Sequence, residues 1–300
     1  MNKLLFLFFL FPVSVYAQTD TSGIKAHLLA ITKTQGFRTY KDLATLDRTA
    51  SYIESVFKQY ADTVYFQTYL VNGVEYKNVI ASFATHQPKR IVTGAHYDVC
   101  GEQQGADDNA SGVTALLELA RMLKGRQLKH RVDLVAYTLE EPPFFRTAHM
   151  GSAVHAASLN KDEIIGMVCL EMIGYFSDAK RSQEYPGRFL KLFYGGRGNY
   201  ITLVKKPGAG KFVRQYKQSF KRADRIRTKV FTGPASLPGI DFSDHQNYWK
   251  AGISALMITD TAFYRNKNYH EETDRVETLE MKRMAKVIDA TYAALMSLAT

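Results

Sequence analysis

The sequence predicts an α/β protein of three layers, in which helices cover both faces of a mixed, mostly parallel sheet. Segments with helical periodicity alternate along the chain with short apolar runs that are typical of buried strands. The first two runs are separated only by Asn72-Gly73, a hairpin dipeptide, so they are expected to pair antiparallel. The later runs are separated by helical segments, as parallel crossovers require.

Periodicity places each element on the chain. Helices are expected at 24–34, 45–60, 110–124, 210–223 and 278–298. Strands are expected at 64–71, 74–83, 91–97, 132–139, 164–170, 189–194 and 253–258. In such folds, ligands bind outside the carboxyl ends of the strands.

The amino terminus differs from the rest of the chain. Lys3 precedes an apolar run from Leu4 to Val15, and Ala17 supplies a small residue at the usual cleavage spacing. This run is shorter than the roughly twenty residues that a membrane span requires. The sequence therefore predicts a signal peptide over residues 1–17, export to the periplasm or the cell exterior, and no transmembrane segment.

The remaining residues, 18–300, are expected to form a single domain, because they contain no internal repeat and no low-complexity linker. An aromatic content of 12% is ample for a large core built around a sheet, and no disulfide framework is needed. Cys100 and Cys169 are the only cysteines. Pairing between them stays open, although free buried thiols are the favoured interpretation.

Basic residues gather in one stretch of the sequence. Residues 176–232 contain fifteen Lys or Arg and three acidic residues, while the whole chain has a net charge of +10. Such a stretch predicts contact with an anionic surface, and a solvated basic face is the alternative. Nucleic acid is not an expected partner, because no nucleic-acid-binding module accompanies the charge.

Acidic and histidine side chains follow four of the predicted strands. The four clusters are His96-Tyr97-Asp98 with the following 105–112 loop, Glu140-Glu141, Glu171, and 269–274. Gathering this much negative charge at one sheet edge is costly unless cations compensate it. Imidazole and carboxylate without thiolate suit zinc, and manganese or cobalt less well. The sequence therefore predicts a catalytic metal centre.

In their order and type, these clusters resemble those of the co-catalytic di-zinc aminopeptidases. That family includes secreted bacterial leucyl aminopeptidases and, more distantly, glutamate carboxypeptidases and glutaminyl cyclases. The resemblance covers about residues 25–299. It implies a zinc-dependent exopeptidase fold and two Zn²⁺ per chain, bridged by one carboxylate and a water. It also implies peptide substrates that are hydrolysed at their N-terminal bond.

The resemblance implies a set of metal ligands. His96 and Glu171 match the ligands of the first metal, and Glu141 and His270 match those of the second. Asp108 matches the aspartate that bridges the two metals, and its peptide bond to the next residue is cis in relatives.

The resemblance also implies catalytic and supporting roles. Glu140 matches the general base, which takes a proton from the bridging water and returns it to the leaving amine. Tyr269 resembles a tyrosine that hydrogen-bonds the developing oxyanion, with plain packing as the alternative. Asp98 would orient the histidine of the first metal. Asp274 would hold either its loop or the nearby histidine ring.

Two features depart from the family pattern. Glu171 stands where the family usually has Asp, and its extra methylene displaces the carboxylate unless the backbone compensates. Residues 142–145 replace a common glycine-containing loop and are expected to reshape the substrate pocket. Candidates for an apolar pocket wall, or for the core instead, are Phe144, Phe145, Tyr175, Phe263 and Tyr264. The segment Ser243-Asp244-His245 also matches the family, with His245 expected to be structural.

Two other functions stay open. One is a glutaminyl cyclase-type enzyme with a single zinc, and the other is a catalytically silent binding protein on the same fold. The number of metals per chain separates the cyclase from the aminopeptidase. Replacement of Glu140 by Gln separates the hydrolase from the binding protein.

Overall fold

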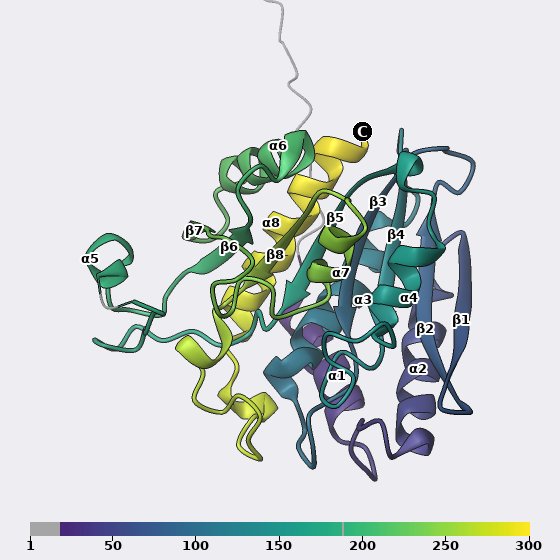
Figure 1. Cartoon of the computed structure of the whole chain (residues 1–300), viewed down its shortest axis with the longest axis horizontal. Helices are drawn as coiled ribbons and strands as arrows, with labels where there is room; N and C mark the ends of the chain where they lie inside the picture. Colours follow the sequence, from purple (N-terminus) through teal and green to yellow (C-terminus); the bar gives the residue numbers. More distant parts are fainter. Residues whose placement is uncertain (1–18, 188) are drawn as a thin grey trace, which may run out of the picture.

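The computed structural model describes residues 19–187 and 189–300 (Figure 1). The predicted signal peptide, residues 1–17, lies outside the described residues. The described part of the chain forms one eight-stranded sheet with the order β1-β2-β4-β3-β5-β8-β6-β7. Its strands are β1 (Thr63–Val71), β2 (Val74–Phe83), β3 (Arg90–His96), β4 (Arg131–Tyr137), β5 (Ile164–Glu171), β6 (Ile201–Lys205), β7 (Thr228–Thr232) and β8 (Ala255–Thr259).

The sheet is mixed, as predicted. β1 and β2 form the expected antiparallel hairpin, and β2 pairs antiparallel with β4. The central pairs β3–β4, β3–β5 and β5–β8 are parallel. At the other end, β6 pairs antiparallel with β8 and parallel with β7.

Helices cover both faces of the sheet and enclose two cores. One face carries α1 (Thr21–Thr32), α2 (Leu43–Phe57), α3 (Gly112–Leu123), α6 (Gly210–Arg222) and α8 (Met281–Ala299). The other face carries α4 (Gly151–Ser158) and α7 (His245–Lys250), which contributes Tyr248 and Trp249 to the second core. The predicted three-layer α/β/α class is therefore confirmed.

Short helical turns complete the described chain. A π-helical turn (Ala106–Ser111) leads into α3, and 3₁₀ turns span Lys161–Glu163, Ala262–Tyr264 and Val276–Thr278. No described helix is both long and apolar enough to cross a bilayer. Both cysteines are free.

The strand predicted at 189–194 is wrong. These residues form the short helix α5 (Leu190–Tyr194), which projects from the body of the molecule at the left of Figure 1. The apolar run is not buried: Phe189, Leu192 and Phe193 are 65%, 86% and 78% exposed. α5 belongs to the basic stretch 176–232, whose contact with an anionic surface stays a prediction.

Four elements were not expected from the sequence. The strands β6 and β7 have five residues each, and β7 is a half-exposed edge strand that contains Lys and Thr. The helices α4 and α7 have eight and six residues. Elements this short contain too few apolar positions for a period to be recognised.

The central strands position the candidate site. His96, the last residue of β3, pairs with Tyr137, the last residue of β4. Glu171 is the last residue of the neighbouring β5. Parallel pairing therefore brings the residues that follow these strands to one edge of the sheet.

A substitution at Gly166 of β5 tests how α6 packs on the sheet. The Phe212 ring of α6 covers this glycine, and an added Cβ would collide with the ring. We expect Gly166→Ala to lower the free energy of unfolding by about 1–3 kcal/mol, because it overpacks a closed interface. Denaturant unfolding measures this change. Phe212→Leu added to Gly166→Ala should recover part of the loss, and an unchanged midpoint in the single variant would contradict this packing.

Candidate functional site

The first predicted ligand group meets at His96. His96 Nε2 lies 3.3 Å from Asp108 Oδ1 and 3.4 Å from Glu171 Oε2. His96 and Glu171 end neighbouring strands, while Asp108 lies in the π-helical turn before α3. All three side chains are buried. Their candidate ligand atoms lie within 4.8 Å of one another, a spacing that suits one metal ion.

The second predicted ligand group meets at His270, in the loop after β8. His270 Nε2 lies 3.2 Å from Asp108 Oδ2 and 3.2 Å from Glu141 Oε2. The two oxygens of the Asp108 carboxylate therefore face different histidines. This is the arrangement that a carboxylate shared by two metals requires.

Several donor atoms at this position lack a hydrogen-bond partner. Asp108 Oδ2, Glu141 Oε1 and His270 Nε2 are buried and unpaired among the described residues. Leaving buried polar atoms unpaired is costly, so such atoms call for a ligand. Nitrogen and carboxylate oxygen are suitable donors for zinc. The residues present therefore fit divalent cations in both groups.

The pKa values show how strongly these charges interact. Burial raises the pKa of Glu141 to about 7, and the Asp108 carboxylate adds to this rise. Burial also raises the pKa of Glu140 well above its usual range, against the opposing effect of His96. Burial disfavours protonated His270, but Asp108 and Glu141 outweigh it and raise its pKa to about 11. Without cations, protonated His270 and protonated carboxyl groups therefore offset the negative charge of the site.

Asp98 organises two parts of the site. Its carboxylate accepts hydrogen bonds from the backbone N–H groups of Glu140 (3.2 Å) and Glu141 (3.1 Å). Its backbone carbonyl lies 3.2 Å from His96 Nδ1, and its Oδ1 lies 3.5 Å from the same nitrogen. Asp98 thus contacts the ring that it was expected to orient, and it also fixes the Glu140-Glu141 backbone.

The loop that carries Asp108 is fixed from two sides. The Asp274 carboxylate accepts hydrogen bonds from the backbone N–H groups of Asp107 and Asp108 at 3.0–3.1 Å, so of the two expected roles it takes the loop-holding one. The Asp108-Asn109 peptide bond is cis, as the family resemblance implies. The Asn109 amide donates to the Leu170 carbonyl at 2.8 Å, which ties this loop to β5.

Two contributing residues were missed. Ser243 Oγ donates to Glu171 Oε2 at 2.6 Å, and only its place in a family-like segment drew attention to it. Arg38 is fully buried. Its guanidinium donates to four backbone carbonyls, those of Ile31, Tyr97, Gln104 and Gly105. No sequence pattern around Arg38 indicates this role.

A cavity of about 300 Å³ opens beside the two ligand groups. Glu140 and Tyr269 line it, and the Tyr269 ring stacks on His270 with centroids 3.8 Å apart. Of the predicted pocket residues, those that line it are Phe145, Phe263 and Tyr264. Phe144 packs edge-on against Tyr40 instead, with ring centroids 5.4 Å apart. Tyr175 is not among the lining residues.

Ser243 offers a test of how the longer Glu171 side chain is positioned. Ser243→Ala removes the only side-chain hydroxyl described as donating to Glu171, so we expect metal affinity to fall about 10–100-fold, as for other outer-shell partners. Competition with a chromogenic chelator measures this affinity. Ser254→Ala, remote from the site, is the control and should leave affinity unchanged. Equal affinities for Ser243→Ala and the parent would contradict the positioning role.

Comparisons with known proteins agree with this geometry. The family model described as Peptidase family M28 matches residues 78–295 of this chain. “Uncharacterized protein YfbL” of Escherichia coli (strain K12) is 39% identical over 98% of this chain and 99% of its own length. “Aminopeptidase YwaD” of Bacillus subtilis (strain 168) is 26% identical over 69% of this chain and 40% of its own length.

Solved structures share the fold. LapB from Legionella pneumophila has a TM-score of 0.73 at 19% identity, covering 93% of this chain and 72% of its own. A glutaminyl cyclase from Fimbriiglobus ruber has a TM-score of 0.70 at 18% identity. The match covers 96% of this chain and 97% of the cyclase chain. The family model and the aminopeptidase relative confirm the expected family and the expected enzyme class, a zinc-dependent exopeptidase. The chain belongs to peptidase family M28.

Proposed function

We propose that the chain is an exported aminopeptidase that binds two zinc ions and hydrolyses the N-terminal peptide bond of its substrates. The observation that carries this proposal is the position of Asp108, whose two carboxylate oxygens face His96 and His270 separately. The name of the B. subtilis relative supports the aminopeptidase activity. The signal-like residues 1–17 support export.

The described side chains fit two ions. His96 and Glu171 would hold the first ion, Glu141 and His270 the second, and Asp108 both. Bound zinc would supply Lewis acidity and would lower the pKa of a water molecule. Glu171 suits its place despite the extra methylene, because Ser243 Oγ holds its Oε2 at 2.6 Å.

Glu140 is placed to transfer protons. Its carboxylate is buried, lines the cavity, and lies 3.9 Å from His96 Nε2. We assign it the role of general base, which takes a proton from the attacking water and delivers it to the leaving amine. Asp98 keeps its backbone in position through the hydrogen bond to the Glu140 N–H group. Tyr269, at the cavity wall, would donate its hydroxyl proton in a hydrogen bond to the developing oxyanion.

The cavity favours substrates with a bulky apolar first residue. Its walls are rich in aromatic rings, and Phe242 lies between Phe145 and Phe263 with centroid separations of 5.9 Å and 6.2 Å. Pro142 also lines the cavity, so the unusual 142–145 loop contributes to it. An apolar side chain buried there gains transfer free energy, whereas a charged one loses hydration. We therefore expect leucyl or phenylalanyl substrates to be preferred over glutamyl ones.

The alternatives are less well supported. A single-zinc glutaminyl cyclase needs only one ligand group. Here His96 Nε2 lies 3.3 Å from one oxygen of the Asp108 carboxylate, and His270 Nε2 lies 3.2 Å from the other, which favours two groups. A silent binding protein would not need Glu140 buried beside the ligand groups.

Glu140→Gln tests the proposal. The amide keeps the size of the side chain but cannot accept the proton from water, so we expect kcat for leucyl anilide to fall about 10²–10⁴-fold. Zinc content and the unfolding midpoint should stay at the parent values, which separates a catalytic loss from a structural one. Glu75→Gln, an exposed substitution on β2 outside the cavity lining, is the matched control. Full activity in Glu140→Gln, or no hydrolysis of any aminoacyl anilide by the parent, would contradict the proposed function.

A further inference from the structure

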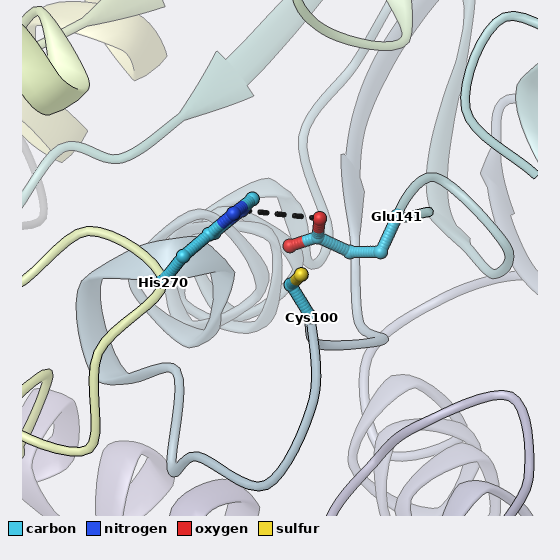
Figure 2. A group of neighbouring side chains, drawn as sticks. All are labelled: Cys100, Glu141 and His270. Carbon is cyan, nitrogen blue, oxygen red and sulfur yellow. Dashed lines mark ion pairs between the residues drawn. The ribbon is translucent and has the colours of Figure 1, made fainter. Parts of the chain in front are cut away.

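The thiol of Cys100 lies beside the second ligand group (Figure 2). Cys100 follows β3, Glu141 follows β4, and His270 follows β8, so three separate loops bring these side chains together. One candidate ligand atom from each, including the Cys100 sulfur, lies within 4.8 Å of the other two. No sequence pattern indicates a metal-binding role for Cys100.

A second observation points to a cation here. Glu141 is only 4% exposed, and its Oε1 has no hydrogen-bond partner among the described residues. His270 Nε2, 3.2 Å from Glu141 Oε2, also lacks one. Figure 2 shows the Glu141 carboxylate and the Cys100 sulfur on the same side of the His270 ring. These unpaired atoms and the Cys100 sulfur are therefore a candidate set of ligands for one metal ion.

Cys100 also has no competing role as a disulfide. Cys169, the other cysteine, is fully buried and free, and its sulfur lies 3.1 Å from Ser243 Oγ. Cys100 itself is half-buried. Its thiol therefore remains available on the side where Glu141 and His270 meet.

We propose that Cys100 is a further ligand of the second metal ion, in addition to Asp108, Glu141 and His270. This inference rests on the proposed two-metal function. The thiol releases its proton to solvent when the sulfur binds the metal. Zinc holds sulfur at about 2.3 Å and nitrogen at about 2.0 Å, a scale that is compatible with one ion between ligand atoms within 4.8 Å of one another.

A sulfur ligand would make the two metal sites chemically different. The first group, His96, Asp108 and Glu171, contains only nitrogen and oxygen donors. Thiolate favours zinc, and oxygen-rich sites suit manganese or magnesium better. The second site would therefore retain zinc or cobalt against manganese more strongly than the first.

Cobalt substitution tests the proposal directly. The mature chain is loaded with Co²⁺ alone, and its bound cobalt is counted by elemental analysis while its absorption spectrum is recorded. We expect two Co²⁺ per chain and a near-ultraviolet charge-transfer band from a thiolate bound to cobalt. Cys100→Ser should lose this band while keeping two Co²⁺. Cys169→Ser is the matched control and should keep the band, because Cys169 lies outside the ligand group.

Each contrary result has a separate meaning. Two Co²⁺ per chain without a thiolate band in the parent would overturn the role of Cys100 and leave the proposed function standing. A thiolate band that persists in Cys100→Ser would also overturn the role of Cys100 and leave the proposed function standing. Fewer than two Co²⁺ per parent chain would overturn both, since no second ion would then be present for Cys100 to bind. The parent spectrum decides the matter even if a variant folds poorly.

Discussion

The burial of several carboxylates at one point is the constraint on which the rest of the site depends. Asp108, Glu140, Glu141 and Glu171 are almost fully buried and lie around two histidines. Like charges at this spacing repel one another, and burial removes the water that would screen them. Divalent cations between them would convert this repulsion into attraction. Cation binding would therefore stabilise this arrangement of buried carboxylates.

Holding the carboxylates in place requires a rigid surrounding shell. Asp98 and Asp274 accept backbone N–H groups of the loops that carry Glu140, Glu141 and Asp108. Arg38 adds a buried positive charge that binds backbone carbonyls in the segments around residues 97 and 105. These contacts come from parts of the chain far apart in sequence, and only the sheet brings them together. The fold thus fixes the loops, and the loops fix the ligands.

Part of this could be predicted from the sequence, because two of the candidate ligands end apolar runs. His96 and Glu171 end buried strands, so recognising the strands also located these two candidate ligands. Ser243 and Arg38 could not be assigned in this way. Ser243 acts on a residue 72 positions away, and Arg38 binds backbone atoms, which leave no sequence pattern. The helix α5 was mistaken for a strand because a short apolar run does not show whether it is buried.

The number of zinc ions per chain shows whether Asp108 is shared by two of them. Zinc would be counted per chain in the purified mature protein by elemental analysis, for the parent and for His270→Ala. We expect two zinc ions in the parent and one in His270→Ala, because the variant removes a ligand of the second ion only. One zinc or none in the parent would contradict it.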